Sequence, residues 1–180
     1  MHVIFQEDAK AEQLNEVINK LLETDWYHQA GFKDEEVETY MQTFLKQLNI
    51  EEYVFIWTNK QSLKETIENL SFRESTIWEK LKDIPDQLKE KIDAKDNKTY
   101  LEKLVEFLPE AVFHPAFDNA YKQFKDEKIV QYLTGNAMYL SILICTAQLA
   151  GEEKLFEPIL RIIEKGHVPV GLKGNEVYLI

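Results

Sequence analysis

Helical spacing of apolar residues recurs along most of this 180-residue chain, and it constrains the fold more than any other feature. In successive segments, large apolar side chains return every three or four residues, which places them on one face of a helix. The clearest stripes begin at Leu14 in residues 9–24 and at Val37 in residues 34–48. Because such stripes must be buried against one another, we predict a mainly α protein.

The most apolar segment covers residues 137–150, after a break expected at Gly135, and contains the single cysteine, Cys145. It is interrupted by Ser141 and Thr146 and is shorter than the roughly 20 residues that a membrane-spanning helix needs. We therefore expect a buried core helix, in which Cys145 acts as a small hydrophobic residue. One cysteine excludes a disulfide within the chain.

Prolines predict where other helices are interrupted. Pro85 is expected to kink a helix or to begin a new one. Pro109 and Pro115 are expected to bracket a short piece that is irregular or helical.

The C-terminal end of the chain has a different pattern, which is typical of a β-hairpin. Apolar residues in 168–172 and 176–180 flank a turn that contains Gly174. Pro169 lacks the N–H that a strand would donate, so the first arm is expected at the edge of a sheet. Residues 53–57, Tyr-Val-Phe-Ile-Trp, predict a short buried strand that can pair with this hairpin.

The predicted fold is therefore mainly α: a multi-helix bundle or a short irregular array of helical hairpins with a small β element. Residues 3–5 are a further candidate strand. The length suits a single domain covering residues 1–180. Residues 93–98 carry no large apolar side chain, and they mark the expected boundary if the domain divides into two lobes.

The formal net charge of −11, from 32 acidic and 21 basic residues, limits the classes of partner. Such a charge repels nucleic acids and anionic membrane surfaces, so neither is predicted as a partner. It favours a protein partner, and a basic one in particular. The N-terminus lacks the basic and apolar regions of a signal peptide, so we expect a cytoplasmic protein.

One candidate metal site combines Glu110, His114 and Asp118, which are spaced by four residues. On a continuous helix these side chains would share one face, as a metal site requires. Pro115 disfavours helix at His114, so we expect a histidine at the boundary of the core and no metal.

The other cluster is Trp26-Tyr27-His28, directly after the first predicted helix. These rings can line a pocket or an interface. The alternative, which we favour, is a helix end whose aromatic rings pack inward while His28 complements the helix dipole.

The sequence contains no glycine-rich phosphate loop, nucleophile elbow, zinc-binding cysteine pair or kinase signature, and it predicts no cofactor. It favours a non-enzymatic protein-interaction or regulatory module, of which a toxin-neutralising immunity protein is one example. A second hypothesis is an enzyme or small-ligand-binding protein with a site around His114 or around Trp26 and His28. A third is a self-associating structural protein, a homodimer formed by strand pairing.

Overall fold

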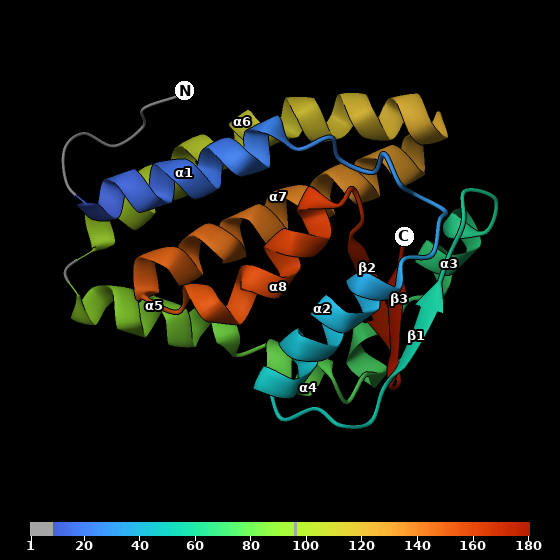
Figure 1. The fold of residues 1–180 in the computed structure, drawn as a ribbon, viewed down its shortest axis with the longest axis horizontal. Coiled ribbons are helices and arrows are strands. Elements are labelled where there is room, and N and C mark those ends of the chain that lie inside the picture. The colour runs from blue at the N-terminus through green and yellow to red at the C-terminus, as the bar shows by residue number, and fades with distance from the viewer. Residues whose placement is uncertain (1–8, 96) are drawn as a thin grey trace.

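The computed structural model describes residues 9–95 and 97–180, so the strand predicted at 3–5 lies outside the described residues. It confirms a mainly helical fold with a small sheet (Figure 1). The helices are α1 (Ala9–Glu23), α2 (Glu35–Gln47), α3 (Leu63–Asn69), the short 3-10 turn η1 (Phe72–Glu74), α4 (Trp78–Leu81), α5 (Ile84–Ala94), α6 (Lys98–Phe124), α7 (Glu127–Ala150) and α8 (Glu153–Glu164). The strands are β1 (Val54–Trp57), β2 (Pro169–Lys173) and β3 (Glu176–Leu179).

Helix α7 occupies the centre of the molecule, with α1 and α6 on one side, α5 on another and α8 in front (Figure 1). The Asp126 carboxylate caps its start by accepting from the Ile129 N–H at 3.2 Å, and Gly151 ends it with φ of 74°. Within the described residues, α7 alone is long and apolar enough to cross a membrane, and over half of its most apolar stretch is buried inside the protein. That burial is expected of a core helix.

The predicted start of this helix, Ala137, is ten residues too late in a helix of 24 residues. Gly135 lies inside the helix as an exposed residue with open space around it. Buried residues on both sides, Leu133 and Ala137, hold this part of the chain in the helix. Tertiary burial thus outweighs the low helix propensity of one glycine.

Helix α6 also corrects the sequence-based expectation, because it runs without a break through Pro109 and Pro115. One row of side chains at four-residue intervals is buried against α7: Leu104, Leu108, Val112, Ala116 and Ala120. A proline inside a helix costs about 3 kcal/mol, whereas burial of each large apolar side chain contributes about 1.5–3 kcal/mol. The continuous buried row offsets the local cost of the two prolines.

The sheet has the order β1-β3-β2, in which β1 is parallel and β2 antiparallel to the central strand. Two predictions for this region are confirmed: the tail forms a hairpin, and the strand near residues 53–57 pairs with it. The predicted burial of that strand is wrong, because β1 lies at the edge of the sheet, where Val54 is exposed and the other three residues are half-buried. Pro169 lies on an edge strand, as predicted. Val177 and Leu179 alternate with more exposed residues along β3, so one face of the sheet covers the helical core.

The junction between α5 and α6 is fastened to the end of α7. The Asn97 side-chain amide donates to the carbonyl of Leu149 at 3.1 Å, and the Lys95 ammonium donates to the carbonyl of Ala150 at 2.7 Å. Both bonds satisfy carbonyls at a helix end that has no further turn to supply donors. Buried side chains from both sides of this junction join one hydrophobic cluster.

Replacing Gly135 by alanine should stabilise the protein by about 0.5–1 kcal/mol, because the site is helical, exposed and free of neighbours that a methyl group would meet. Urea unfolding measures the change. Gly174→Ala is the matched control: a methyl group has equal room there, but Gly174 has φ of 57° in the hairpin turn. The control should lower stability, and a loss of stability in both variants would contradict the helical assignment of residue 135.

Candidate functional site

Two members of the predicted aromatic cluster, Trp26 and Tyr27, are core residues. The Trp26 indole donates to the carbonyl of Leu21 at 3.1 Å, and the Tyr27 hydroxyl donates to the carbonyl of Leu133 at 2.6 Å. Burial raises the pKa of Tyr27 far above its usual value, so the ring stays neutral. Both side chains pack inward, and their polar groups are satisfied by backbone carbonyls.

His28 is exposed and lies beside the end of α8. Its Nδ1 is 2.8 Å from the carbonyl oxygen of Asp25, and its ring lies so close to Gly166 that a Cβ there would be 2.1 Å from Nδ1. Gly166 therefore makes room for the imidazole as well as taking φ of 80°. The three residues of the cluster do not surround a common cavity.

His167 is a buried histidine whose setting the sequence did not reveal. Its Nδ1 lies 3.1 Å from the carbonyl oxygen of Ile180, and its ring stands edge-on to Trp57 at 5.3 Å between centroids. Burial lowers the pKa of His167 below its usual value, although the bond to Ile180 and the charge of Asp34 act in the opposite direction. The folded protein thus keeps this imidazole neutral.

Glu110, His114 and Asp118 do share the outer face of α6, because the helix continues through Pro115. All three side chains are exposed, and His114 contacts the Phe113 ring edge-on at 5.5 Å between centroids. The described residues contain no group of three or more histidine, cysteine, aspartate or glutamate side chains placed to hold a metal. The row is therefore a solvated helix face in this structure.

A concave site lies elsewhere, lined by residues of α2, η1, α4, α5, α7, α8 and the hairpin. It is a pocket of about 400 Å³ lined by none of the six candidate residues from the sequence. Its floor reaches the buried core, and its walls are almost wholly apolar. Buried residues that line it include Met41, Phe44, Leu140, Phe156, Ile159 and Val177.

The outer wall of the pocket is an irregular segment between α3 and α5. Phe72 and Trp78 in this segment pack edge-on with 5.2 Å between ring centroids, and both line the pocket. The segment is attached to β2 through a hydrogen bond from the Ser71 N–H to the Leu172 carbonyl at 3.2 Å. Phe72 is 36% exposed and Tyr139, on helix α7, is 46% exposed, so both of these lining residues also reach solvent.

The wall formed by β2 is fixed to α7 by two side-chain hydrogen bonds. The Asn136 amide donates to the carbonyl of Pro169 at 2.9 Å, and the Tyr132 hydroxyl donates to the carbonyl of Val170. Both acceptors belong to a strand at the sheet edge, where carbonyls would otherwise lack partners. The pocket therefore has one wall that is firmly held and an outer wall with fewer attachments.

Acid–base groups are scarce around this pocket. No aspartate, glutamate, histidine, serine or cysteine side chain lines it, and Arg73 is the one charged residue in its described lining. Cys145 is buried elsewhere on α7, and burial raises the pKa of its thiol well above the usual range. The pocket can bind apolar groups, but it offers no pair of side chains for proton transfer or nucleophilic attack.

Comparisons with family models, with curated proteins and with solved structures return no match for this chain. The site is therefore interpreted from its own geometry.

His167 should make the protein less stable as the pH falls from about 7 to 5. The unfolded chain binds a proton near the usual histidine pKa of about 6.5, whereas the folded state resists protonation, so acid favours unfolding. His167→Gln should flatten this slope in urea-unfolding measurements across that range. His114→Gln, which removes an exposed imidazole on α6, is the matched control. If the stability of the parent and that of His167→Gln changed equally with pH, the assignment of this pH dependence to His167 would be contradicted.

Proposed function

We propose that this protein is a non-catalytic binding protein whose apolar pocket takes a small hydrophobic molecule. The observation that carries the proposal is the pocket itself, a solvent-open apolar pocket of about 400 Å³ with no carboxylate, histidine or cysteine in its lining. Ligand sites in proteins are typically apolar concavities of about 300–1,000 Å³ with few polar groups. The proposal retains small-ligand binding, the second hypothesis from the sequence, but places the binding site at a different set of residues.

The size of the pocket argues against a simple packing defect. An enclosed dry void of this volume would cost roughly 10 kcal/mol at about 24 cal/mol per Å³, which is comparable with the whole stability of a domain. Because the pocket opens to solvent, the cost takes the form of apolar walls left in contact with water. A ligand that covers these walls removes this apolar surface from water and stabilises the folded protein.

Replacement of Leu143, a half-buried lining residue on α7, tests the proposal. The probe is N-phenyl-1-naphthylamine, an uncharged aromatic molecule that fluoresces strongly in apolar surroundings. The parent protein should bind one equivalent of it, and Leu143→Trp should weaken binding about tenfold because the indole occupies the pocket. Fluorescence titration gives both dissociation constants.

Leu101→Trp is the matched control, since Leu101 is a half-buried leucine on α6 that does not line the pocket. It should leave the affinity for the probe unchanged. If the parent does not bind the probe, or if both tryptophan variants weaken binding equally, the pocket is not the binding site.

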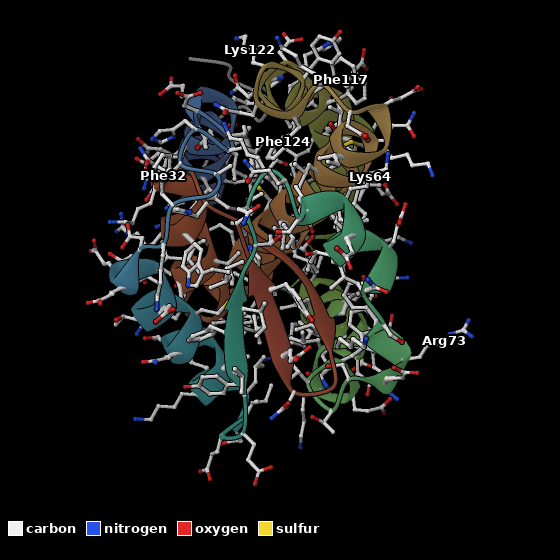
Figure 2. The ribbon with its side chains drawn as sticks, turned by 90° about the vertical axis from the view of Figure 1, so that its right-hand side faces the viewer. Phe32, Lys64, Arg73, Phe117, Lys122 and Phe124 are labelled. Atoms are coloured by element: carbon white, nitrogen blue, oxygen red, sulfur yellow. The ribbon has the colours of Figure 1, made fainter. Side chains whose placement is uncertain are left out.

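A second candidate function, protein binding, is favoured by the surface of α6. Phe113 and Tyr121 are exposed, and half-buried Phe117 lies between them, so that neighbouring rings stack with centroids 5.4 Å and 6.2 Å apart. We call these three residues the aromatic row. Figure 2 shows Phe117 at the top of the molecule and Phe32 farther down on the left. Exposed aromatic rings stacked against a half-buried ring on an otherwise well-packed helix are typical of interface anchors.

The aromatic row belongs to a flank of α6 in which each apolar residue is followed in the sequence by a polar one. Four of these polar residues are exposed and acidic: Glu102, Glu106, Glu110 and Asp118. The outer edge of this surface is therefore mostly negative, with His114 and Lys122 as the exceptions. A basic amphipathic segment of a partner protein fits such a surface through apolar contact and charge complementarity. This occupant agrees with the partner expected from the net charge.

A synthetic helix of leucine and lysine at amphipathic spacing is the probe for this second candidate. The double variant Phe113→Ser with Tyr121→Ser keeps the net charge, and it should weaken peptide binding about tenfold because two aromatic contacts are lost. Phe32→Ser, which removes a phenylalanine that is 66% exposed elsewhere, should bind like the parent. If all three proteins bound the peptide with equal affinity in calorimetric titrations, the peptide would be attracted by charge alone and the aromatic row would not be its binding site.

A further inference from the structure

We infer that the pocket selects an amphiphile with an apolar body and a carboxylate head, held at the pocket mouth by Arg73. The inference rests on the proposed function and specifies the chemistry of its ligand. It follows from the polar groups that line the pocket, from the position of the only charged residue among them and from the charge of the rest of the chain.

The side-chain polar groups of the lining are mainly hydrogen-bond donors. Arg73 supplies guanidinium N–H groups, Trp78 an indole N–H and Tyr139 a hydroxyl, and none of these groups has a side-chain hydrogen bond or ion pair within the described residues. Asn136 already donates its amide to Pro169. A ligand that satisfies free donors must present acceptors, and a carboxylate presents two oxygens that accept only.

Arg73 adds a charge of the required sign. It lies in η1 on the outer wall of the pocket, and Figure 2 shows its side chain extending outward from that wall. The other arginine, Arg161, is held by Glu157 at 3.6 Å and Glu164 at 3.1 Å on α8. Arg73 has no such carboxylate partner among the described residues. Because Figure 2 shows this exposed guanidinium pointing away from the molecule, the side chain has to turn toward the opening to form a two-pronged contact with a carboxylate head.

Each end of such a ligand then lies in surroundings that suit its polarity. The apolar tail lies among the floor residues, where no polar atom would lose water without a partner, and the charged head stays at the solvent edge. The net charge of −11 repels anions in general. A free carboxylate without a tail therefore gains nothing at this site, whereas a tail of suitable length brings the head to Arg73.

Displacement of bound N-phenyl-1-naphthylamine by three ten-carbon ligands tests the inference at pH 7.5. Decanoate, decan-1-ol and decylamine share one tail and differ in the charge of the head. The parent protein should prefer decanoate to decan-1-ol by about fivefold, the ratio expected for one ion pair at the edge of a pocket, and should bind decylamine most weakly. Arg73→Gln should lose the preference for decanoate while it keeps its affinity for decan-1-ol and for the probe.

Arg161→Gln makes the same change of charge at an arginine that does not line the pocket, and it should keep the full preference. If decanoate and decan-1-ol bind the parent equally, or if Arg161→Gln loses the preference as much as Arg73→Gln, the inference is overturned while the apolar pocket stands. If the parent binds neither the probe nor decan-1-ol, the proposed function itself fails.

Discussion

Burial of α7 is the constraint on which the rest of the structure depends. Its residues are apolar on most sides, so the helix needs partners on most sides, and α1, α5, α6 and α8 supply them. The end of the helix is fastened through Asn97 and Lys95, whose donors satisfy carbonyls of its last turn. Side chains of Tyr132 and Asn136 in its first half bind carbonyls of β2. One helix thus positions both the other helices and the small sheet.

The same constraint explains which parts of the fold could be predicted from the sequence. Amphipathic stripes predict α1, α2 and α8 because each helix presents one apolar face to this centre. The hairpin could be predicted because its turn chemistry is local: Gly174 takes positive φ between two apolar arms. The lengths of α6 and α7 could not, because Pro109, Pro115 and Gly135 are local signals of interruption. In these helices the buried rows, a property of the assembled fold, outweigh the local signals.

The pocket was beyond prediction for a related reason. Its walls come from segments as distant in sequence as Met41 and Val177, and each lining residue also fits an ordinary core or boundary position in its own helix or strand. The residues that seemed most distinctive have structural roles instead, since Trp26 and Tyr27 satisfy backbone carbonyls and His114 faces solvent. An apolar pocket forms where apolar side chains surround a space that no side chain fills, and only the arrangement of the elements in the folded protein shows such a space. A catalytic motif, by contrast, is recognised from residue types and spacing.

The unequal attachment of the pocket walls bears on how a ligand can enter. The inner wall belongs to α7 and to a strand bound to it, so its opening would disturb the most buried part of the protein. The outer wall consists of η1 and the four-residue helix α4, joined to the sheet near Ser71 and supported by the contact of Phe72 with Trp78. Local opening in proteins occurs first where few buried contacts are lost. Ile77 of this segment nevertheless belongs to the core cluster, so the wall is tied to the core as well as to the sheet. In the proposed complex, a tail that contacts both walls would add contacts to the outer wall and so stabilise it.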